Sequence, residues 1–181
     1  MTYLINPEIS TKQKNIIIGT ILGGSSLIKP HKGKNCYLSM RGKDFDWLNW
    51  KSNELSNLSG SDPITKEKTY RWHSICYPVF NNFYEIFYKK NKRSIKIETL
   101  NLLQEMSIAV WFKDCGAIKS NQAIFNTNVW GEKGTSIILK YFKSLEWECE
   151  IFKERNSLRI KLSVETTKEI LDMKKVLGKQ S

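Results

Sequence analysis

The chain has 181 residues, and its 29 lysines and arginines against 18 aspartates and glutamates give a net charge of +11. A chain of this length can bury a core without disulfide staples, as one domain or as two small fused halves. The strong positive charge argues against a small neutral substrate and favours a polyanionic partner, above all nucleic acid. Lysine far outnumbers arginine, as in proteins of AT-rich genomes, and that bias alone would also raise the pI.

The cysteines and the first apolar run exclude several other classes. Cys36, Cys76, Cys115 and Cys149 stand more than thirty positions apart, so no CxxC pair is present to build a zinc knuckle or a redox motif. The apolar run at residues 16–27 is interrupted by glycines and serines, is too short to span a bilayer and does not resemble a signal peptide. Neither a disulfide framework nor a membrane partner is expected.

The first predicted element is a helix at residues 12–23, KQKNIIIGTILG, with an unusually apolar interior. Gly19 and Gly23 are four residues apart and therefore share one face of this helix. Each glycine costs about 1 kcal/mol relative to alanine, and close approach of a second helix explains the pair. A buried strand would give a similar pattern, so this spacing alone is a weak signal.

The rest of the first half alternates between strand-like and helix-like patterns. Leu38 and Met40 are expected to face the core from a strand, with Ser39 and Arg41 on its open face. The predicted elements are a polar loop at 29–35, a strand at 36–41, a helix at 43–57 with Phe45, Trp47 and Leu48 on its apolar stripe, a turn at 59–63, a strand at 69–76 and a helix from Pro78.

From Ile97 the pattern restarts, which implies two similar halves at residues 1–95 and 96–181 that form one compact unit. The lysine run at residues 89–93, KKNKR, is interpreted as a solvated link between the halves, with contact to a phosphate backbone as the alternative. The predicted elements of the second half are a helix at about 100–114, a strand at 122–130, a helix near 135–145, strands at 147–153 and 158–164 and a helix at about 166–177.

Two segments give the chain its family resemblance. Residues 17–25, IIGTILGGS, and residues 108–116, IAVWFKDCG, resemble the two motifs of single-chain LAGLIDADG homing endonucleases, and similarity of the flanks extends it over about residues 12–177. The resemblance implies an α+β fold of two pseudo-symmetric αββαββα halves in a monomer. The motif helices would pack along a pseudo-two-fold axis, and two antiparallel sheets would form a saddle over nucleic acid.

The resemblance, combined with strand alternation, predicts which side chains face the groove. Arginine, lysine, asparagine and serine suit phosphates and base edges. The candidates are Ser39, Arg41, Arg71, His73, Lys119, Asn126, Asn128, Arg159, Lys161 and Ser163. His73 and His31 are interpreted as polar groove contacts or surface residues, because neither has a carboxylate at ligand-like spacing. Most of the six tryptophans are expected to be core or interface rings.

The resemblance also implies that the eighth residue of each motif should be an acidic metal ligand. These positions hold Gly24 and Cys115. Mg²⁺ prefers oxygen ligands, and the soft sulfur of cysteine suits it poorly. Asp114 precedes Cys115, but a one-residue shift turns a helical side chain by about 100°. No catalytic residue and no bound metal are therefore expected, with Asp114 as the one residual candidate ligand.

We therefore expect a nucleic-acid-binding protein that lacks cleavage activity and needs no cofactor. Its expected ligand is structured RNA, either rRNA in an organellar ribosome, with ribosomal proteins as neighbours, or intron RNA bound by a maturase. Composition and family habit suggest a mitochondrion or a plastid, although an AT-rich bacterium or phage fits the same composition. The alternative is an active Mg²⁺-dependent homing endonuclease that cuts duplex DNA at an intron insertion site, and a DNA-binding regulator is a third hypothesis.

Overall fold

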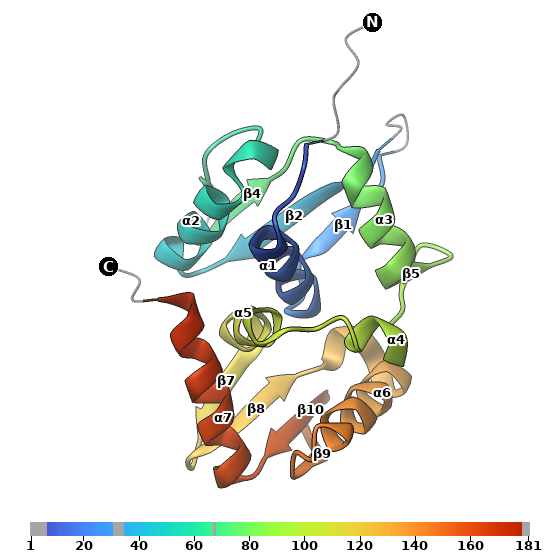
Figure 1. The fold of residues 1–181 in the computed structure, drawn as a ribbon, viewed down its shortest axis with the longest axis vertical. Helices are drawn as coiled ribbons and strands as arrows, with labels where there is room; N and C mark the ends of the chain where they lie inside the picture. Colours follow the sequence, from blue (N-terminus) through green and yellow to red (C-terminus); the bar gives the residue numbers. More distant parts are fainter. Residues whose placement is uncertain (1–6, 31–34, 67, 179–181) are drawn as a thin grey trace, which may run out of the picture.

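The computed structural model describes residues 7–30, 35–66 and 68–178, and their elements occur in the same order twice (Figure 1). The first set is α1 (Thr11–Leu22), β1 (Ser26–Ile28), β2 (Tyr37–Gly42), α2 (Phe45–Glu54), β3 (Ile64–Lys66), β4 (Thr69–His73) and α3 (Pro78–Phe87). The second set is α5 (Glu105–Cys115), β7 (Gly116–Lys119), β8 (Gln122–Asn126), α6 (Gly131–Ser144), β9 (Cys149–Glu154), β10 (Ser157–Leu162) and α7 (Val164–Lys174). Each set therefore reads αββαββα.

Shorter elements connect or extend these two sets. They are the hairpin β5 (Tyr88–Lys89) and β6 (Lys92–Arg93), the short helix α4 (Ile97–Leu100) and the 3-10 turns η1 (Ser56–Leu58), η2 (Asn128–Trp130) and η3 (Lys175–Leu177). The expected division at residues 95 and 96 falls between β6 and α4, and its status as a domain boundary stays a prediction. Within the described residues, no helix is both long and apolar enough to cross a membrane.

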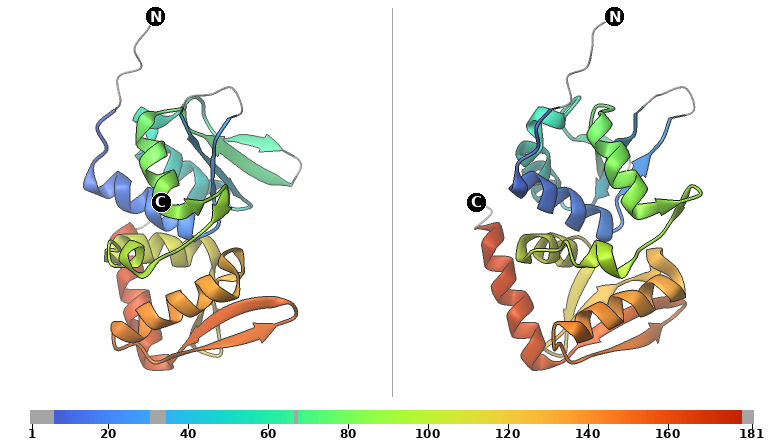
Figure 2. Two further views of the ribbon diagram at one scale, coloured as in Figure 1. Left: turned by 90° about the vertical axis from the view of Figure 1, so that its right-hand side faces the viewer. Right: turned by 45° about the vertical axis from the view of Figure 1, so that its right-hand side comes forward.

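Each set builds one four-stranded antiparallel sheet, with strand orders β1-β2-β4-β3 and β7-β8-β10-β9. Helices cover one face of each sheet, and α1 and α5 lie side by side between the two sheets (Figure 1). The hairpins β3-β4 and β9-β10 project to the same side of the molecule, away from α1 and α5 (Figure 2, left). The predicted fold class is confirmed.

The seam between α1 and α5 explains the two glycines of the first helix. A Cβ atom on Gly19 would collide with the carbonyl oxygen of Ser107, and one on Gly23 would collide with the side chain of Asp114. Polar side chains fix the register of the seam, because Asn15 donates to Gln104 at 2.6 Å and accepts from Ser107 at 2.7 Å. The expected close approach of a second helix is confirmed.

The buried faces of the sheets follow the predicted alternation. Leu38, Met40 and Trp72 are fully buried beneath the helices. The expectation for tryptophan is also confirmed, because Trp47, Trp72, Trp111, Trp130 and Trp147 are buried. Phe45 was expected on the apolar stripe of its helix, yet it is 42% exposed at the first residue of α2 and lies against Tyr70 instead.

Several element boundaries differ from the sequence-based expectation. The expected helix at 100–114 begins only at Glu105, because Gln104 is extended and accepts the hydrogen bond from Asn15. The expected strand at 122–130 ends at Asn126, where the chain turns into η2, and the strand at 69–76 ends at His73. The short strands β1, β3 and β7 were not predicted, since three or four residues carry too little alternation to identify them.

Candidate nucleic-acid interface

The open face of the first sheet brings four of the predicted residues together. In the register of β2 and β4, Ser39 lies opposite His73 and Arg41 lies opposite Arg71. The Nε atom of Arg41 donates to Thr69 at 3.2 Å, and within the described residues no ion pair joins Arg41 or Arg71 to a carboxylate. This face therefore carries two adjacent guanidinium groups, that of exposed Arg41 and that of partly buried Arg71, and arginine is a residue type suited to phosphate contacts.

The open face of the second sheet differs, because its predicted cations are already paired. Lys119 and Arg159 both bind Glu154, at 2.6 and 2.5 Å, and Lys161 binds Glu150 at 2.7 Å. These hydrogen bonds, from Lys161 to Glu150 and from Lys119 to Glu154, lower the pKa of both carboxyl groups. Sequence reasoning missed both glutamates, of which Glu150 lies directly opposite Lys161 and Glu154 lies opposite Ser157, two residues before Arg159.

The other predicted groove residues have local roles or lie elsewhere. Asn126 is exposed at the end of β8, and its side-chain oxygen accepts from the backbone N–H of Asn128 at 3.2 Å. Asn128 therefore lies in η2, outside the sheet in which it was expected. Ser163 was expected on the groove face, yet its hydroxyl caps α7 by accepting from the N–H of Thr166. His31 lies outside the described residues.

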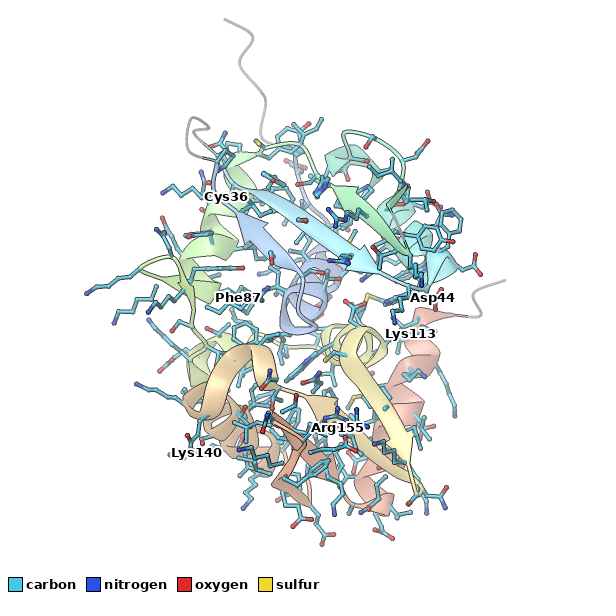
Figure 3. The ribbon with its side chains drawn as sticks, turned by 180° about the vertical axis from the view of Figure 1, so that it is seen from behind. Cys36, Asp44, Phe87, Lys113, Lys140 and Arg155 are labelled. Carbon is cyan, nitrogen blue, oxygen red and sulfur yellow. The ribbon has the colours of Figure 1, made fainter. Side chains whose placement is uncertain are left out.

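A cleft of about 760 Å³ opens where the two motif helices end. Its cationic lining residues are Arg41, Lys43, Lys51 and Lys113. Figure 3, which views the molecule from the side of the sheets, shows Asp44 and Lys113 close together at the junction of the two halves. Their charged groups are 4.0 Å apart. Asp44 and Asp114 also line the cleft, so its four cations are opposed by two carboxylates. The cleft therefore keeps an excess of positive charge beside the open face of the first sheet.

At the end of the second motif, Asp114 is bound by residues of α2. Lys51 donates to its Oδ1 atom at 2.6 Å, and the indole N–H of Trp47 donates to the same oxygen at 2.5 Å. The side chains of Lys51 and Asp114 are only 4% and 9% exposed. The other oxygen of Asp114, Oδ2, is buried with no hydrogen-bond partner among the described residues. An ammonium group and an indole N–H therefore already bind one of the two oxygens of this carboxylate.

Cys115 stands at the expected metal position and is a protonated thiol at neutral pH. Burial raises the pKa of this thiol to about 12, and the Asp114 carboxylate acts in the same direction. Its sulfur lies 3.5 Å from the carbonyl oxygen of Asn126, to which the thiol donates. A protonated thiol does not bind Mg²⁺, and the soft thiolate would bind it poorly.

We expect Cys115 to alkylate with iodoacetamide far more slowly than Cys76 at pH 8. The reactive species is the thiolate, and a rise from the ordinary value of 9.0 to about 12 leaves roughly a thousandfold less of it. Peptide mass spectrometry of a labelling time course measures the alkylation rates, and equal rates at Cys115 and Cys76 would contradict the assigned shift.

The raised pKa of Cys115 in the folded state also predicts that the stability of the protein falls as the pH rises from about 9 toward 12.

At the end of the first motif, Gly24 has a φ angle of +112°, and its carbonyl oxygen binds Arg93 from β6 at 2.9 Å. The guanidinium also donates to the carbonyl oxygens of Ser25 and Ile21 and to the hydroxyl of Ser26, at 2.6, 3.3 and 3.1 Å. Burial lowers the pKa of Arg93 from its ordinary value. Arg93 therefore lies at the end of α1, as Lys51 lies at the end of α5.

The interpretation of residues 89–93 as a solvated link holds for the exposed residues 89–92 but was wrong for Arg93. These residues form the β5-β6 hairpin, whose turn residues Lys90 and Asn91 have positive φ angles, and Arg93 points back to the end of α1. Its guanidinium also lies 5.6 Å from the centre of the Trp130 ring. A run of basic residues carries no sign of which member turns inward, so the sequence alone does not single out Arg93.

The donor groups at the motif ends do not fit a hard divalent cation. In the described part of the chain, no three or more histidine, cysteine, aspartate or glutamate side chains are placed to hold a metal ion. Gly24 has no side-chain donor, Cys115 offers a thiol, and Asp114 is already bound to Lys51. Mg²⁺ binds through carboxylate and other oxygen ligands, so this set does not match its requirements.

Comparison with known proteins identifies the fold. A comparison with curated proteins gave no match. The homing endonuclease I-WcaI bound to its DNA recognition sequence has a TM-score of 0.83 at 20% identity, covering 94% of this chain and 82% of that chain. I-DmoI in complex with DNA and Mn gives 0.61 at 10% identity, covering 90% and 95%. Full-length DUF199/WhiA from Thermatoga maritima gives 0.59 at 15% identity, covering 93% and 57%.

These identities show a shared fold and nothing finer about this chain. The sequence profile of the LAGLIDADG DNA endonuclease family matches residues 14–170, which span both motif helices and both sheets. The chain belongs to the LAGLIDADG DNA endonuclease family.

Proposed function

We propose that this protein binds helical nucleic acid through its saddle without cleaving it, and that its ligand is structured RNA. The RNA would be an organellar rRNA or an intron that the protein helps to fold, and ribosomal proteins would be its neighbours in the first case. The proposal includes a mitochondrial or plastid location and no cofactor. I-WcaI and I-DmoI were both solved with DNA, which supports a nucleic-acid ligand for this saddle.

The observation that carries the proposed loss of cleavage is the buried contact between Lys51 and Asp114. Metal-dependent phosphodiester hydrolysis uses carboxylates to hold ions that activate water and stabilise the leaving oxygen. Asp114 is the one carboxylate at the motif ends, and both Lys51 and Trp47 bind it. A metal ion at Asp114 would share the carboxylate with the buried ammonium group of Lys51, and the two positive charges would repel each other.

The preference for RNA rests on the binding surface that accompanies this altered centre. Lysine and arginine contact the phosphates of A-form and B-form helices alike, so a basic saddle suits an RNA helix without new chemistry. Arg41 and Arg71 keep a cationic face open on the first sheet. A protein that does not cut has no need of a DNA target, whereas it can still stabilise a folded RNA.

Cleavage is tested by incubating the purified protein with duplex DNA of its own insertion locus in Mg²⁺ or Mn²⁺. We expect neither nicks nor double-strand breaks. Cleavage that disappears in Asp114→Asn would overturn the proposal and support an active homing endonuclease. A contaminating nuclease would act equally in both preparations, so the matched variant separates the two sources of cutting.

The ligand is tested by crosslinking the tagged protein in its native cell and sequencing the nucleic acid recovered at moderate salt. Recovery of rRNA or of one intron RNA is the expected result. Recovery of a unique duplex DNA site, with no enriched RNA, would replace the RNA proposal with a DNA-binding regulator. An RNA recovered equally by an Arg41→Gln/Arg71→Gln variant would mean that the saddle is not the binding surface.

A further inference from the structure

The two open faces of the saddle differ in how their cations are compensated. On the first sheet, Arg41 and Arg71 are directly opposite each other on adjacent strands. Like charges in this position destabilise a sheet by roughly 0.2–1 kcal/mol, and an anion between them relieves the repulsion. The Nε atoms of Arg71 and of Arg159 on the second sheet are both buried without a hydrogen-bond partner in the described part of the chain. The difference between the faces is that no ion pair among the described residues joins Arg41 or Arg71 to a carboxylate.

On the second sheet, carboxylates already fill the role of that ligand. Glu154 accepts from Lys119 and forms an ion pair with Arg159, and Glu150 accepts from Lys161. A phosphate oxygen makes charge-assisted contacts of the same kind with lysine or arginine. A phosphate approaching these cations would have to displace a carboxylate or lie beside its negative charge.

The two faces differ in the pairing of their cations. On the second sheet, Lys119, Arg159 and Lys161 are paired with two carboxylates, and Arg155 also lies close enough to lower the pKa of Glu154. The guanidiniums of Arg41 and Arg71 have no such partner among the described residues. The cleft beside the first sheet adds Lys43, which also has no ion pair among the described residues, and Lys113, which lies 4.0 Å from Asp44. Exposed pairs contribute little to stability, so their main effect is on the field that a nucleic acid meets.

We propose that the saddle is electrostatically one-sided: the first sheet and its cleft anchor the phosphate backbone, while Glu150 and Glu154 hold the second sheet as a charge-neutralised surface. This inference rests on the proposed nucleic-acid binding and adds where its affinity originates. Contacts to the second sheet are then made mainly by uncharged groups, such as the exposed Asn126, which suit base edges and sugars. In this assignment the first half binds the phosphate backbone, and the second half contacts base edges and sugars.

The test is the salt dependence of binding to a 24-base-pair RNA duplex, followed by fluorescence anisotropy between about 50 and 300 mM KCl. Each phosphate contact steepens the slope of the logarithm of the association constant against the logarithm of the salt concentration by about 0.9. This corresponds to about eightfold in affinity at 0.1 M salt. We expect Arg41→Gln and Arg71→Gln each to remove about that much. Arg159→Gln and Lys161→Gln should each remove less than about a third of it.

A second and more discriminating set of variants removes the carboxylates instead of the cations. Glu150→Gln/Glu154→Gln should tighten binding and raise the slope by about 1 to 2, because the three cations of the second sheet become free. Glu98→Gln/Glu165→Gln, two exposed changes on α4 and α7 that add the same charge away from the sheet, is the control for net charge alone. Unchanged slopes in the double glutamine variant, or an Arg159→Gln loss equal to that of Arg41→Gln, would overturn the one-sided assignment.

Two further measurements keep the outcomes separate. Thermal unfolding of Arg41→Gln should show no loss of stability, since one of two opposed like charges is removed, so weaker binding cannot be ascribed to misfolding. If the unaltered protein shows no salt-dependent binding to duplex RNA or duplex DNA, the proposed function itself fails, and this inference fails with it. Binding with equal contributions from the two sheets refutes only the inference.

Discussion

Replacement of Lys51 by methionine is expected to lower the free energy of unfolding by about 3–5 kcal/mol, the cost of leaving a buried charge without its partner. The reason is the environment of Asp114, whose carboxylate is 9% exposed and whose Oδ2 already has no hydrogen-bond partner among the described residues. Without the ammonium group, only the indole N–H of Trp47 would remain to compensate the charge. Urea denaturation followed by tryptophan fluorescence measures the change.

The matched control for Lys51 is Lys113, the other lysine at this junction. Its ammonium group is 32% exposed and 4.0 Å from Asp44, so Lys113→Met should cost less than about 1 kcal/mol. Adding Asp114→Asn to Lys51→Met should recover most of the lost stability, because the buried charge is then removed. Equal losses in Lys51→Met and Lys113→Met, or no recovery in the double variant, would show that the pair is not a buried charge pair.

Replacement of Arg93 by methionine is expected to cost about 3–4 kcal/mol. The guanidinium donates to the carbonyl oxygens of Ile21, Gly24 and Ser25 and to the hydroxyl of Ser26, and hydrogen bonds from a charged group contribute about 1.5–3 kcal/mol each before compensation by water. Methionine fills a similar volume but leaves these oxygens without a donor. The change is measured by chemical denaturation at neutral pH.

Lysine and a neighbouring residue provide the controls for Arg93. Arg93→Lys should recover only part of the loss, since an ammonium group lacks the planar fork that spans several carbonyl oxygens. Lys92→Met, an exposed substitution one residue earlier on β6, should change stability by less than about 0.5 kcal/mol. Similar effects of Arg93→Met and Lys92→Met would mean that the hydrogen bonds at the end of α1 contribute little.

The sequence predicted well those parts of the fold that depend on the local spacing of glycine, apolar and polar residues. The spacing of Gly19 and Gly23, together with the motif resemblance, predicted a helix seam, and the alternation around Leu38 and Met40 identified the buried face of β2. The same alternation placed Arg41 on the solvent-facing side of β2. Such patterns survive folding because helix and strand periodicities decide which side chains share a face.

Long-range pairings escaped prediction, and they are what define the site. Lys51 and Asp114 are sixty-three positions apart, and Arg93 and Gly24 are sixty-nine apart, so no periodicity connects them. Composition did not single out Lys51 or Arg93 either, because each is one cation among many in a lysine-rich chain. The carboxylates of Glu150 and Glu154 were missed for a different reason, since only the sheet register reveals that they face the cations of β10 and β7.

Gly24 has a consequence for the descent of this protein. Its φ of +112° is a conformation that aspartate rarely adopts, so restoring the acidic residue strains the backbone even though the nearest atom to a Cβ there, on Val129, is 4.0 Å away. Cys115 could be reverted separately, yet Lys51 and Arg93 would still occupy the two motif ends. A pair of carboxylates at the motif ends thus needs coordinated changes in the motifs, α2 and β6. If cleavage is lost as proposed, a lineage in this state has no short mutational path back to a cutting enzyme.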